Sequence, residues 1–252
     1  MASFFQKLFG RSASAPALTS LAALGTDMHS HLLPGLDDGA ETLEQSVELL
    51  RQMQQLGYRK LVMTPHIMGD FYRNTPEGIR GALAALRTVA ADNGIELELE
   101  CAAEYYLDES LTRKLEQGQE LLSFGGERRY LLFETSYINE PFNLNEIVFG
   151  LKAAGYQPVL AHPERYTYLY GRFEELARIR EQGVLLQLNL NSLVGYYSPS
   201  AKRVAEKLID AGLIDLAGTD MHHLKHASAL QRVLQSSYLP RLLALPLLNR
   251  DL

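Results

Sequence analysis

Two histidines separated by a single residue are the most chemically suggestive feature of this 252-residue chain. His29 and His31 lie in the segment Asp27-Met28-His29-Ser30-His31, directly after the mostly apolar stretch 21–26. Alternate side chains of an extended segment point to the same side, so both imidazoles would face one way. This spacing suits a metal chelate, although the pair alone is equally compatible with two surface histidines that bind nothing.

Other histidines and carboxylates follow later apolar segments. The ends of the predicted strands carry His66, Glu104, Glu134, His162, Asp220 and His222, and the turn after the first strand adds Asp37-Asp38-Gly39. One such residue is usually a helix cap or a solvated rim residue. So many ionisable groups in one place would be costly to desolvate without cations. The sequence therefore predicts a shared metal site.

The donor types restrict the metal and the reaction. Imidazoles and carboxylates without thiolates suit manganese, iron or zinc and argue against a closed structural zinc site. The candidates are too many for a single ion, and a carboxylate such as Glu104 could bridge two ions. Paired ions roughly 3.5–4 Å apart clamp phosphoryl groups, so hydrolysis of a phosphate ester is the expected chemistry.

Short apolar segments alternate with amphipathic ones along the chain. We predict strands at 21–26, 60–63, 95–101, 130–133, 158–161, 184–190 and 214–217, with helices at 41–56, 76–93, 144–154 and 201–211. Such alternation implies parallel pairing, and polar residues after nearly every strand favour an α/β fold of the (β/α) barrel type. An open doubly wound sheet is the alternative, but it would gather its ligands at one switch point.

Composition excludes several classes of protein. With 46% hydrophobic residues, the chain can form one domain over residues 21–252 after a flexible N-terminal tail, residues 1–20. The net charge of −6 without long charged runs argues against nucleic-acid binding. We find no signal-peptide core and no apolar run that could span a bilayer, and expect a cytoplasmic protein without stable membrane insertion. A short amphipathic foot is the alternative for the tail.

The single cysteine, Cys101, excludes an intramolecular disulfide and fits a reducing compartment. A cysteine-dependent phosphatase places an arginine six residues after its nucleophile, but that position here is Leu107. We therefore expect Cys101 to be a small buried residue without a catalytic role.

Seven ordered segments together resemble one known family: Asp27-Met-His-Ser-His31, Asp37-Asp-Gly39, Thr64-Pro-His66, Ala103-Glu-Tyr-Tyr106, Leu132-Phe-Glu134, Ala161-His-Pro-Glu-Arg-Tyr166 and Gly218-Thr-Asp-Met-His222. They look like the PHP (polymerase and histidinol phosphatase) family over Thr26 to about Leu234. More closely they resemble its bacterial manganese-dependent tyrosine-protein phosphatases, which act on autophosphorylating tyrosine kinases of capsule and exopolysaccharide synthesis. The resemblance implies a distorted, TIM-like (β/α)7 barrel holding three metal ions.

The resemblance also implies a ligand for each position. One metal would take His29, His31, Glu104 and Asp220; a second would share Glu104 with Glu134 and His162; a third would take Asp38, His66 and His222. Asp38 is preferred to Asp37 because the family's ligand directly precedes the glycine. Asp37 would then be a turn residue or an acceptor behind the ligands. Manganese is the expected metal, with iron or zinc as alternatives.

Arg165 matches a family arginine that holds the phosphate, and a bidentate guanidinium suits that role. We expect Arg165 and His66 to be catalytic; the alternative for Arg165 is a surface salt bridge with Glu164. Related enzymes can carry a second phosphate-binding arginine after the Asp-x-His motif, which the stretch 223–227 lacks. There, His223, Lys225 and His226 could supply the charge or simply begin a solvated helix.

The leading functional hypothesis is a metal-dependent protein-tyrosine phosphatase acting on the phosphorylated tail of an autokinase. A PHP phosphatase for small molecules such as histidinol phosphate is its closest rival, and a metal-binding scaffold without activity is the third. A mouth near Tyr105, Tyr106, Tyr166, Tyr196 and Tyr197 could receive a peptide, although tyrosines equally often serve as barrel packing. No oligomeric state is predicted.

Overall fold

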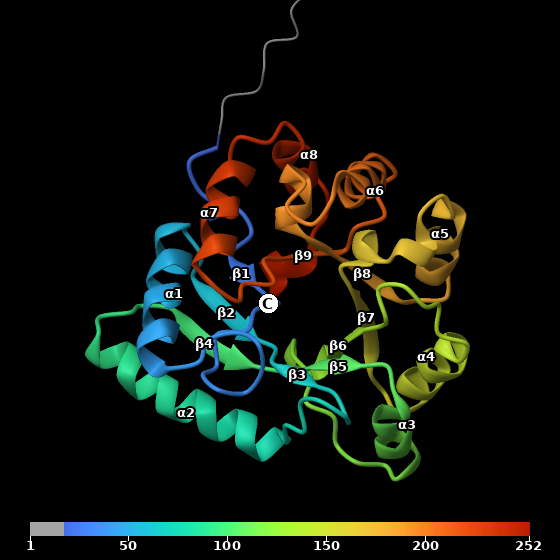
Figure 1. Cartoon of the computed structure of the whole chain (residues 1–252), viewed down its shortest axis with the longest axis horizontal. Helices are drawn as coiled ribbons and strands as arrows, with labels where there is room; N and C mark the ends of the chain where they lie inside the picture. The colour runs from blue at the N-terminus through green and yellow to red at the C-terminus, as the bar shows by residue number, and fades with distance from the viewer. Residues whose placement is uncertain (1–17) are drawn as a thin grey trace, which may run out of the picture.

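A computed structural model describes residues 18–252 and places short strands at the centre with helices around them (Figure 1). Residues 1–17, most of the predicted tail, lie outside the described part of the chain. Leu18 is described: its backbone N–H donates to the carbonyl of Leu234 at 3.2 Å.

All ladder pairings between the described strands are parallel. The strands are β1 (Thr26–Asp27), β2 (Lys60–Met63), β3 (His66–Ile67), β4 (Glu98–Cys101), β5 (Glu104–Tyr106), β6 (Tyr130–Glu134), β7 (Gln157–Ala161), β8 (Leu185–Asn189) and β9 (Leu216–Gly218). They form two sheets, ordered β1-β2-β4 and β3-β5-β6-β7-β8-β9. Parallel neighbours must be joined by a crossover, and a helix lies in the connection between each pair of neighbouring strands.

The two sheets continue one another. The strand β2 passes into β3 through Thr64-Pro65, and β4 passes into β5 through Ala102-Ala103. Pro65 interrupts the ladder because proline has no N–H to donate. A parallel bridge between Ser30 and Met221 then joins the end of β1 to the end of β9. The nine short strands therefore follow the course of the seven predicted ones, which agrees with the predicted distorted (β/α)7 arrangement.

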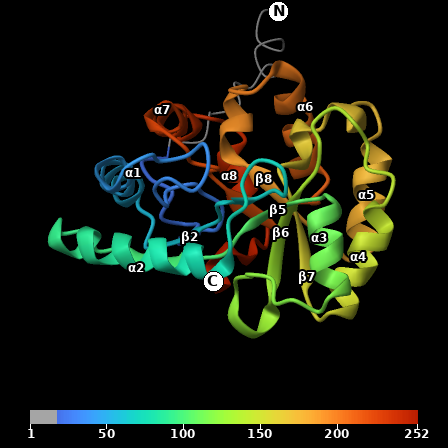
Figure 2. The same cartoon turned by 60° about the horizontal axis from the view of Figure 1, so that its bottom comes forward.

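Helices cover the outside of this ring (Figures 1 and 2). They are α1 (Leu43–Gln55), α2 (Pro76–Asp92), α3 (Glu109–Glu116), α4 (Leu144–Ala153), α5 (Phe173–Glu181), α6 (Pro199–Asp210), α7 (Leu224–Val233) and α8 (Leu239–Leu243). In α1, Thr42 caps the first turn by accepting from the N–H of Gln45, and Val47, Leu50 and Met53 form a buried stripe. In the described residues, none of the helices has the length and apolarity needed to cross a membrane.

Apart from the bridge between Ser30 and Met221, the strands β1 and β9 do not form a backbone ladder. Side-chain hydrogen bonds join them instead. Asp27 accepts from the N–H of Thr219 at 2.9 Å and from its hydroxyl at 2.8 Å. On the other side, the buried amide of Asn249 accepts from the N–H of Ala217 at 2.8 Å and donates to the carbonyl of Thr26 at 3.0 Å. These bonds satisfy buried backbone groups that a regular strand pair would satisfy itself.

The predicted strand 21–26 is wrong except at its end. Residues 22–24 form a turn in which Leu24 N–H donates to the carbonyl of Leu21 at 2.9 Å, and only Thr26–Asp27 is strand. Gly25, with φ 75°, allows the chain to leave this turn. The prediction was wrong because Leu21 and Leu24, three residues apart, are buried in the core from a turn and not from a strand.

Candidate metal centre and catalytic cavity

The rings of His29 and His31 are held in a defined orientation by acceptors behind them. Nδ1 of His29 lies 2.9 Å from Oε1 of Gln187, and Nδ1 of His31 lies 2.7 Å from Oδ2 of Asp37. In the neutral form of each ring, these acceptors favour the hydrogen on Nδ1, which leaves the lone pair of Nε2 available to a metal. The two Nε2 atoms face each other at 3.2 Å, a distance suited to sharing a cation.

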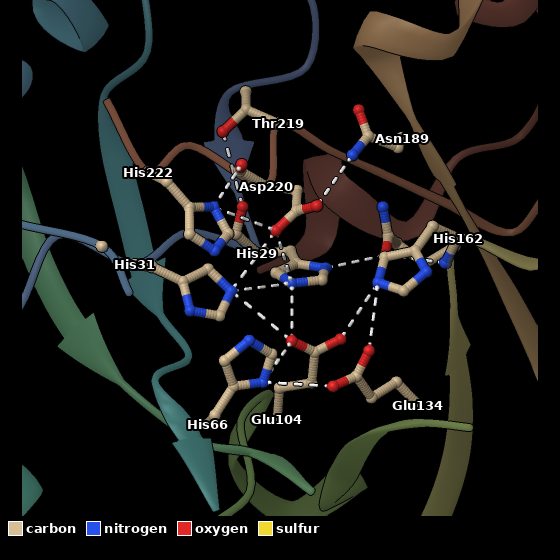
Figure 3. A network of polar contacts seen from close by, with 12 residues as sticks. His29, His31, His66, Glu104, Glu134, His162, Asn189, Thr219, Asp220 and His222 are labelled. Atoms are coloured by element: carbon tan, nitrogen blue, oxygen red, sulfur yellow. Dashed lines mark hydrogen bonds and ion pairs between the residues drawn. The ribbon is translucent and has the colours of Figure 1, made fainter. Parts of the chain in front are cut away.

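Two carboxylates converge on the same pair of nitrogens (Figure 3). Oδ1 of Asp220 lies 3.3 Å from Nε2 of both His29 and His31. Oε2 of Glu104 lies 3.3 Å and 3.5 Å from the same two atoms. Burial alone would raise the pKa of Glu104, but the charges of His29 and His66 outweigh burial and hold that pKa well below its usual range.

A second group forms around His66 and His222. Oδ1 of Asp38 lies 3.6 Å from Nε2 of His66 and 3.5 Å from Nε2 of His222. Asp37 instead points behind the site, where its Oδ2 accepts from the N–H of His66 at 3.0 Å in addition to contacting His31. The structure therefore places Asp38 among the predicted ligands His66 and His222, and Asp37 behind His31 and His66.

The third group consists of Glu104, Glu134 and His162. Oε1 of Glu104 lies 3.2 Å from Nε2 of His162, which lies 3.9 Å from Oε2 of Glu134. Burial, with the charge of Glu104 next, raises the pKa of Glu134 well above its usual range. Burial, with Arg165 next, lowers the pKa of His162 to about 4. Without cations, the two carboxylates repel each other and the imidazole stays neutral, which is the state that ligates metals.

All nine predicted ligands therefore meet at one place. The groups able to hold an ion overlap: His31, Asp38, His66 and His222; His29, His31 and Asp220; His29, Glu104 and His162; His66, Glu104 and Glu134. Because the donor set combines five imidazoles with four carboxylates and contains no thiolate, it fits divalent transition metals.

The backbone of the site is strained at two of these residues. His162 and Asp220 adopt left-handed conformations, with φ 33° and φ 50°, which side chains other than glycine rarely occupy. Such strain persists where the surroundings fix it and is concentrated at functional sites. Two glycines allow close packing: a Cβ at Gly39 would lie 2.0 Å from the carbonyl oxygen of His31, and one at Gly218 would lie 2.7 Å from Cβ of His29.

Arg165 contacts the carboxylate oxygen of Asp220 that does not face His29 and His31. Its Nη1 donates to Oδ2 of Asp220 at 2.7 Å, and its guanidinium lies 3.9 Å from the ring centre of Tyr197 and 4.6 Å from that of Tyr137. Arg165 lines the cavity, and within residues 18–252 its Nε and Nη2 make no hydrogen bond to the protein, so two donors remain for a ligand. The alternative salt bridge with Glu164 is wrong: that carboxylate is buried and accepts from Ser192 at 2.7 Å.

Seven of the nine predicted ligands line a cavity of about 450 Å³ together with Arg165; His29 and His31 are fully buried behind it. Of the tyrosines suggested for its mouth, Tyr106 lines it and Tyr197 contacts Arg165. The other three serve packing: Tyr105 and Tyr166 are buried, with hydroxyls that accept from backbone N–H groups, and Tyr196 packs against His226.

The stretch 223–227 offers Lys225 and His223 near the site. Both line a neighbouring cavity of about 630 Å³ that shares Asp38 and His222 with the metal centre. His226 is buried and accepts from the N–H of His222 at 3.1 Å. Burial lowers its pKa to about 3, so it supplies no positive charge near neutral pH.

Comparison with known proteins agrees with this geometry. Residues 25–236 match the family described as capsular polysaccharide synthesis, CpsB/CapC. The chain belongs to the CpsB/CapC family. It is 30% identical over 199 residues to the tyrosine-protein phosphatase YwqE of Bacillus subtilis, covering 79% of this chain and 78% of YwqE. It is 27% identical over 198 residues to the putative tyrosine-protein phosphatase CapC of Staphylococcus aureus, covering 79% and 77%.

A solved relative shares the fold of this CpsB/CapC chain. It comes from crystal structures of YwqE from Bacillus subtilis and CpsB from Streptococcus pneumoniae, described as unique metal-dependent tyrosine phosphatases. The match has a TM-score of 0.75 and 29% identity, covering 83% of this chain and 86% of the other.

Sequence reasoning missed three residues of this CpsB/CapC site. Gln187 holds His29, and its Nε2 is fixed by the carbonyl of Leu188 at 2.8 Å. Tyr72 stacks on His66, and Tyr137 lies over Arg165. A glutamine in the middle of the mostly apolar strand 184–190 is a usable signal, because a buried side-chain amide needs hydrogen-bond partners. The two loop tyrosines carried no such signal.

Proposed function

We propose that this CpsB/CapC protein is a metal-dependent protein-tyrosine phosphatase that does not use a cysteine nucleophile. The observation that carries the proposal is the convergence of five histidines and four carboxylates beside Arg165, with all of these residues except the fully buried His29 and His31 lining one cavity. Relatives covering most of the chain are named tyrosine-protein phosphatases. We further propose that residues 21–252 act as a single catalytic domain.

Three metal ions, with manganese as the expected one and iron or zinc as alternatives, would occupy the site. His29, His31, Glu104 and Asp220 would hold the first, Glu104, Glu134 and His162 the second, and Asp38, His66 and His222 the third. The overlapping donor groups support this division. When bound, the ions supply the acidity that makes water a nucleophile near neutral pH and neutralise the negative charge of the phosphate.

The remaining chemistry belongs to the protein's own side chains. Arg165 presents Nε and Nη2 to the phosphate, and its planar fork suits two equatorial oxygens of the transition state. Its Nη1 keeps Oδ2 of Asp220 occupied, so Oδ1 stays directed at the histidines. His66 stays oriented because its backbone N–H donates to Asp37 and its ring stacks on Tyr72. Tyrosine leaves with a pKa of about 10 and needs less proton donation than an alkyl alcohol.

Cys101 takes no part in this mechanism. It lies on β4, packs against the apolar core, and is not among the residues that line the cavity. Burial raises the pKa of its thiol, which is the opposite of what a nucleophilic cysteine needs.

The proposed physiological substrate is the phosphorylated tail of an autophosphorylating tyrosine kinase of capsule or exopolysaccharide synthesis, met in the cytoplasm. Membership of a capsular polysaccharide synthesis family supports this choice. The rival small substrate, histidinol phosphate, is an alkyl phosphate, so the same site would have to protonate a far more basic leaving group.

Steady-state hydrolysis by the metal-loaded protein tests the proposal. We expect a phosphotyrosine peptide to give a kcat/KM at least about tenfold above that of histidinol phosphate, and H29A to abolish both activities. Preference for histidinol phosphate would support the small-molecule alternative. Absence of any phosphatase activity in a fully metallated protein would leave the metal-binding scaffold as the better description.

A further inference from the structure

Most of the large apolar side chains that are exposed in residues 18–252 lie on two loops that contribute to the wall of the cavity. Six large hydrophobic residues are exposed in residues 18–252: Phe71, Tyr137, Ile138, Phe142, Phe149 and Leu224. Four of them lie on two loops, residues 68–73 between β3 and α2 and residues 135–143 between β6 and α4. Phe71 is 78% exposed, Ile138 73% and Phe142 fully so. Exposed apolar groups collected in this way mark interaction sites.

Aromatic residues fix the inner ends of both loops to the catalytic groups. The ring of Tyr72 stacks on that of His66 with centroids 5.5 Å apart and planes 15° from parallel. Tyr137 lies over Arg165, and its hydroxyl donates to Oε2 of Glu134 at 3.3 Å. Both tyrosines line the cavity, together with Met68 and Ile138 from the same loops. A phosphate beside Arg165 therefore places whatever it is attached to between the two loops.

We propose that these loops form an apolar rim, consisting of Phe71, Ile138 and Phe142, that selects polypeptides with large apolar side chains beside the phosphotyrosine. The inference rests on the proposed function, because the phosphotyrosine must enter the cavity for its neighbours to reach the rim. Each apolar side chain that the rim covers is removed from water, and burying one leucine strengthens binding by about tenfold or more.

Shape and charge favour a polypeptide as the occupant. The rim borders two hollows: Ile138 lines the catalytic cavity, and Phe142 lines a second cavity of about 760 Å³ together with Asp70, Arg73 and Asp108. Side chains of a flexible segment can fill both hollows, whereas a flat bilayer can fill neither. Carboxylates near the rim, with a net charge of −6 on the chain, would also repel an anionic bilayer surface.

Paired substrates test the rim. Two peptides of the same length and charge carry phosphotyrosine flanked on both sides by leucine or by serine, and para-nitrophenyl phosphate lacks flanking residues altogether. We expect the native metal-loaded protein to favour the leucine peptide by about tenfold or more in kcat/KM. The double variant F71S/F142S should bring that ratio close to 1 while kcat/KM for para-nitrophenyl phosphate stays within about twofold of native.

Phe149 supplies the matched control, since it is 75% exposed but lies on α4, outside both loops, and does not line either cavity. The variant F149S should keep the native preference. An equal rate with both peptides, an equal effect of F149S, or a parallel loss with para-nitrophenyl phosphate would overturn the inference. So would rim-dependent binding to phosphatidylcholine–phosphatidylglycerol vesicles, or rim-dependent dimerisation, because each assigns the surface to another occupant.

A separate measurement of peptide binding distinguishes failure of this inference from failure of the proposed function. The affinities of fluorescein-labelled versions of both peptides for the metal-free protein are compared by fluorescence anisotropy. Absence of turnover with a retained leucine preference in binding would count against the phosphatase proposal alone. Turnover without any preference for leucine, in rate and in binding, would count against the rim alone.

Discussion

Arg165 holds the outer oxygen of Asp220: its Nη1 donates to Oδ2 at 2.7 Å, while Oδ1 lies 3.3 Å from Nε2 of both His29 and His31. One carboxylate thus links the proposed metal ligands to the proposed phosphate-binding arginine. The arrangement explains how a guanidinium can remain buried, because Asp220 balances its charge and two aromatic faces cover it.

Replacing Arg165 should impair phosphate binding more than metal binding. We expect R165A to lower kcat/KM for phosphotyrosine by about 100- to 1000-fold, as for loss of one transition-state donor, with phosphate becoming a weaker inhibitor. R165K restores charge without the fork and should recover only part of the loss. Metal content by mass spectrometry serves as the control; near-native activity of R165A would contradict the assigned role.

The ring of Tyr197 should matter through Arg165. The guanidinium lies 3.9 Å from the ring centre, so Y197L should lower kcat/KM by about tenfold, whereas Y197F keeps an aromatic face and should lose less. In an R165A background, Y197L should cause little further loss, which a double-mutant cycle measures. Equal losses for Y197F and Y197L would assign the effect to the hydroxyl instead.

Gln187 should affect metal affinity indirectly, through the ring of His29 that it orients. Its Oε1 accepts from Nδ1 of His29 at 2.9 Å, so Q187L removes the bond that fixes the ring and its tautomer. We expect metal affinity to fall by about 10- to 100-fold in a competition titration with a chelating dye. Gln157 lies at the start of β7 and donates to Gly183. Q157L should leave the affinity unchanged, and equal losses would disprove a specific role.

Cys101 should be both dispensable and slow to react. Burial raises the pKa of its thiol above the ordinary value of 9.0, so less thiolate is present at pH 8 than in a free cysteine. Iodoacetamide should therefore alkylate it slowly at pH 8 and faster as the pH rises past 9, with N-acetylcysteine as the reference. C101S should keep near-native activity; its inactivation, with metal content unchanged, would revive a thiol mechanism.

Asn249 should stabilise the seam between β1 and β9. Its buried amide bonds to the N–H and carbonyl of Ala217 and to the carbonyl of Thr26. N249A leaves these buried groups unpaired and should lower the free energy of unfolding by about 3 kcal/mol in urea titrations. N139A, at an exposed loop position, should change it by less than about 0.5 kcal/mol. A similar small effect of N249A would mean that water replaces the amide.

The sequence could indicate that the predicted ligands would converge because most of them closely follow a predicted strand, where the change from apolar to ionisable residues is visible locally; Asp38, in the turn after β1, is the exception. Local patterns also placed the four predicted helices and six of the seven predicted strands within a few residues. The failures have physical causes. Leu21 and Leu24 are buried from a turn, so apolar character there did not mean a strand. Gln187 and Tyr137 act through contacts with residues distant in the chain, which no local pattern records.

Phosphate release from a phosphotyrosine peptide through a cycle of metal removal and return tests the central claim most directly. The account predicts that activity is lost on dialysis against EDTA and returns on addition of manganese, iron or zinc, in the native protein and in C101S alike. Activity that survives complete metal removal, or that disappears in C101S, would contradict it.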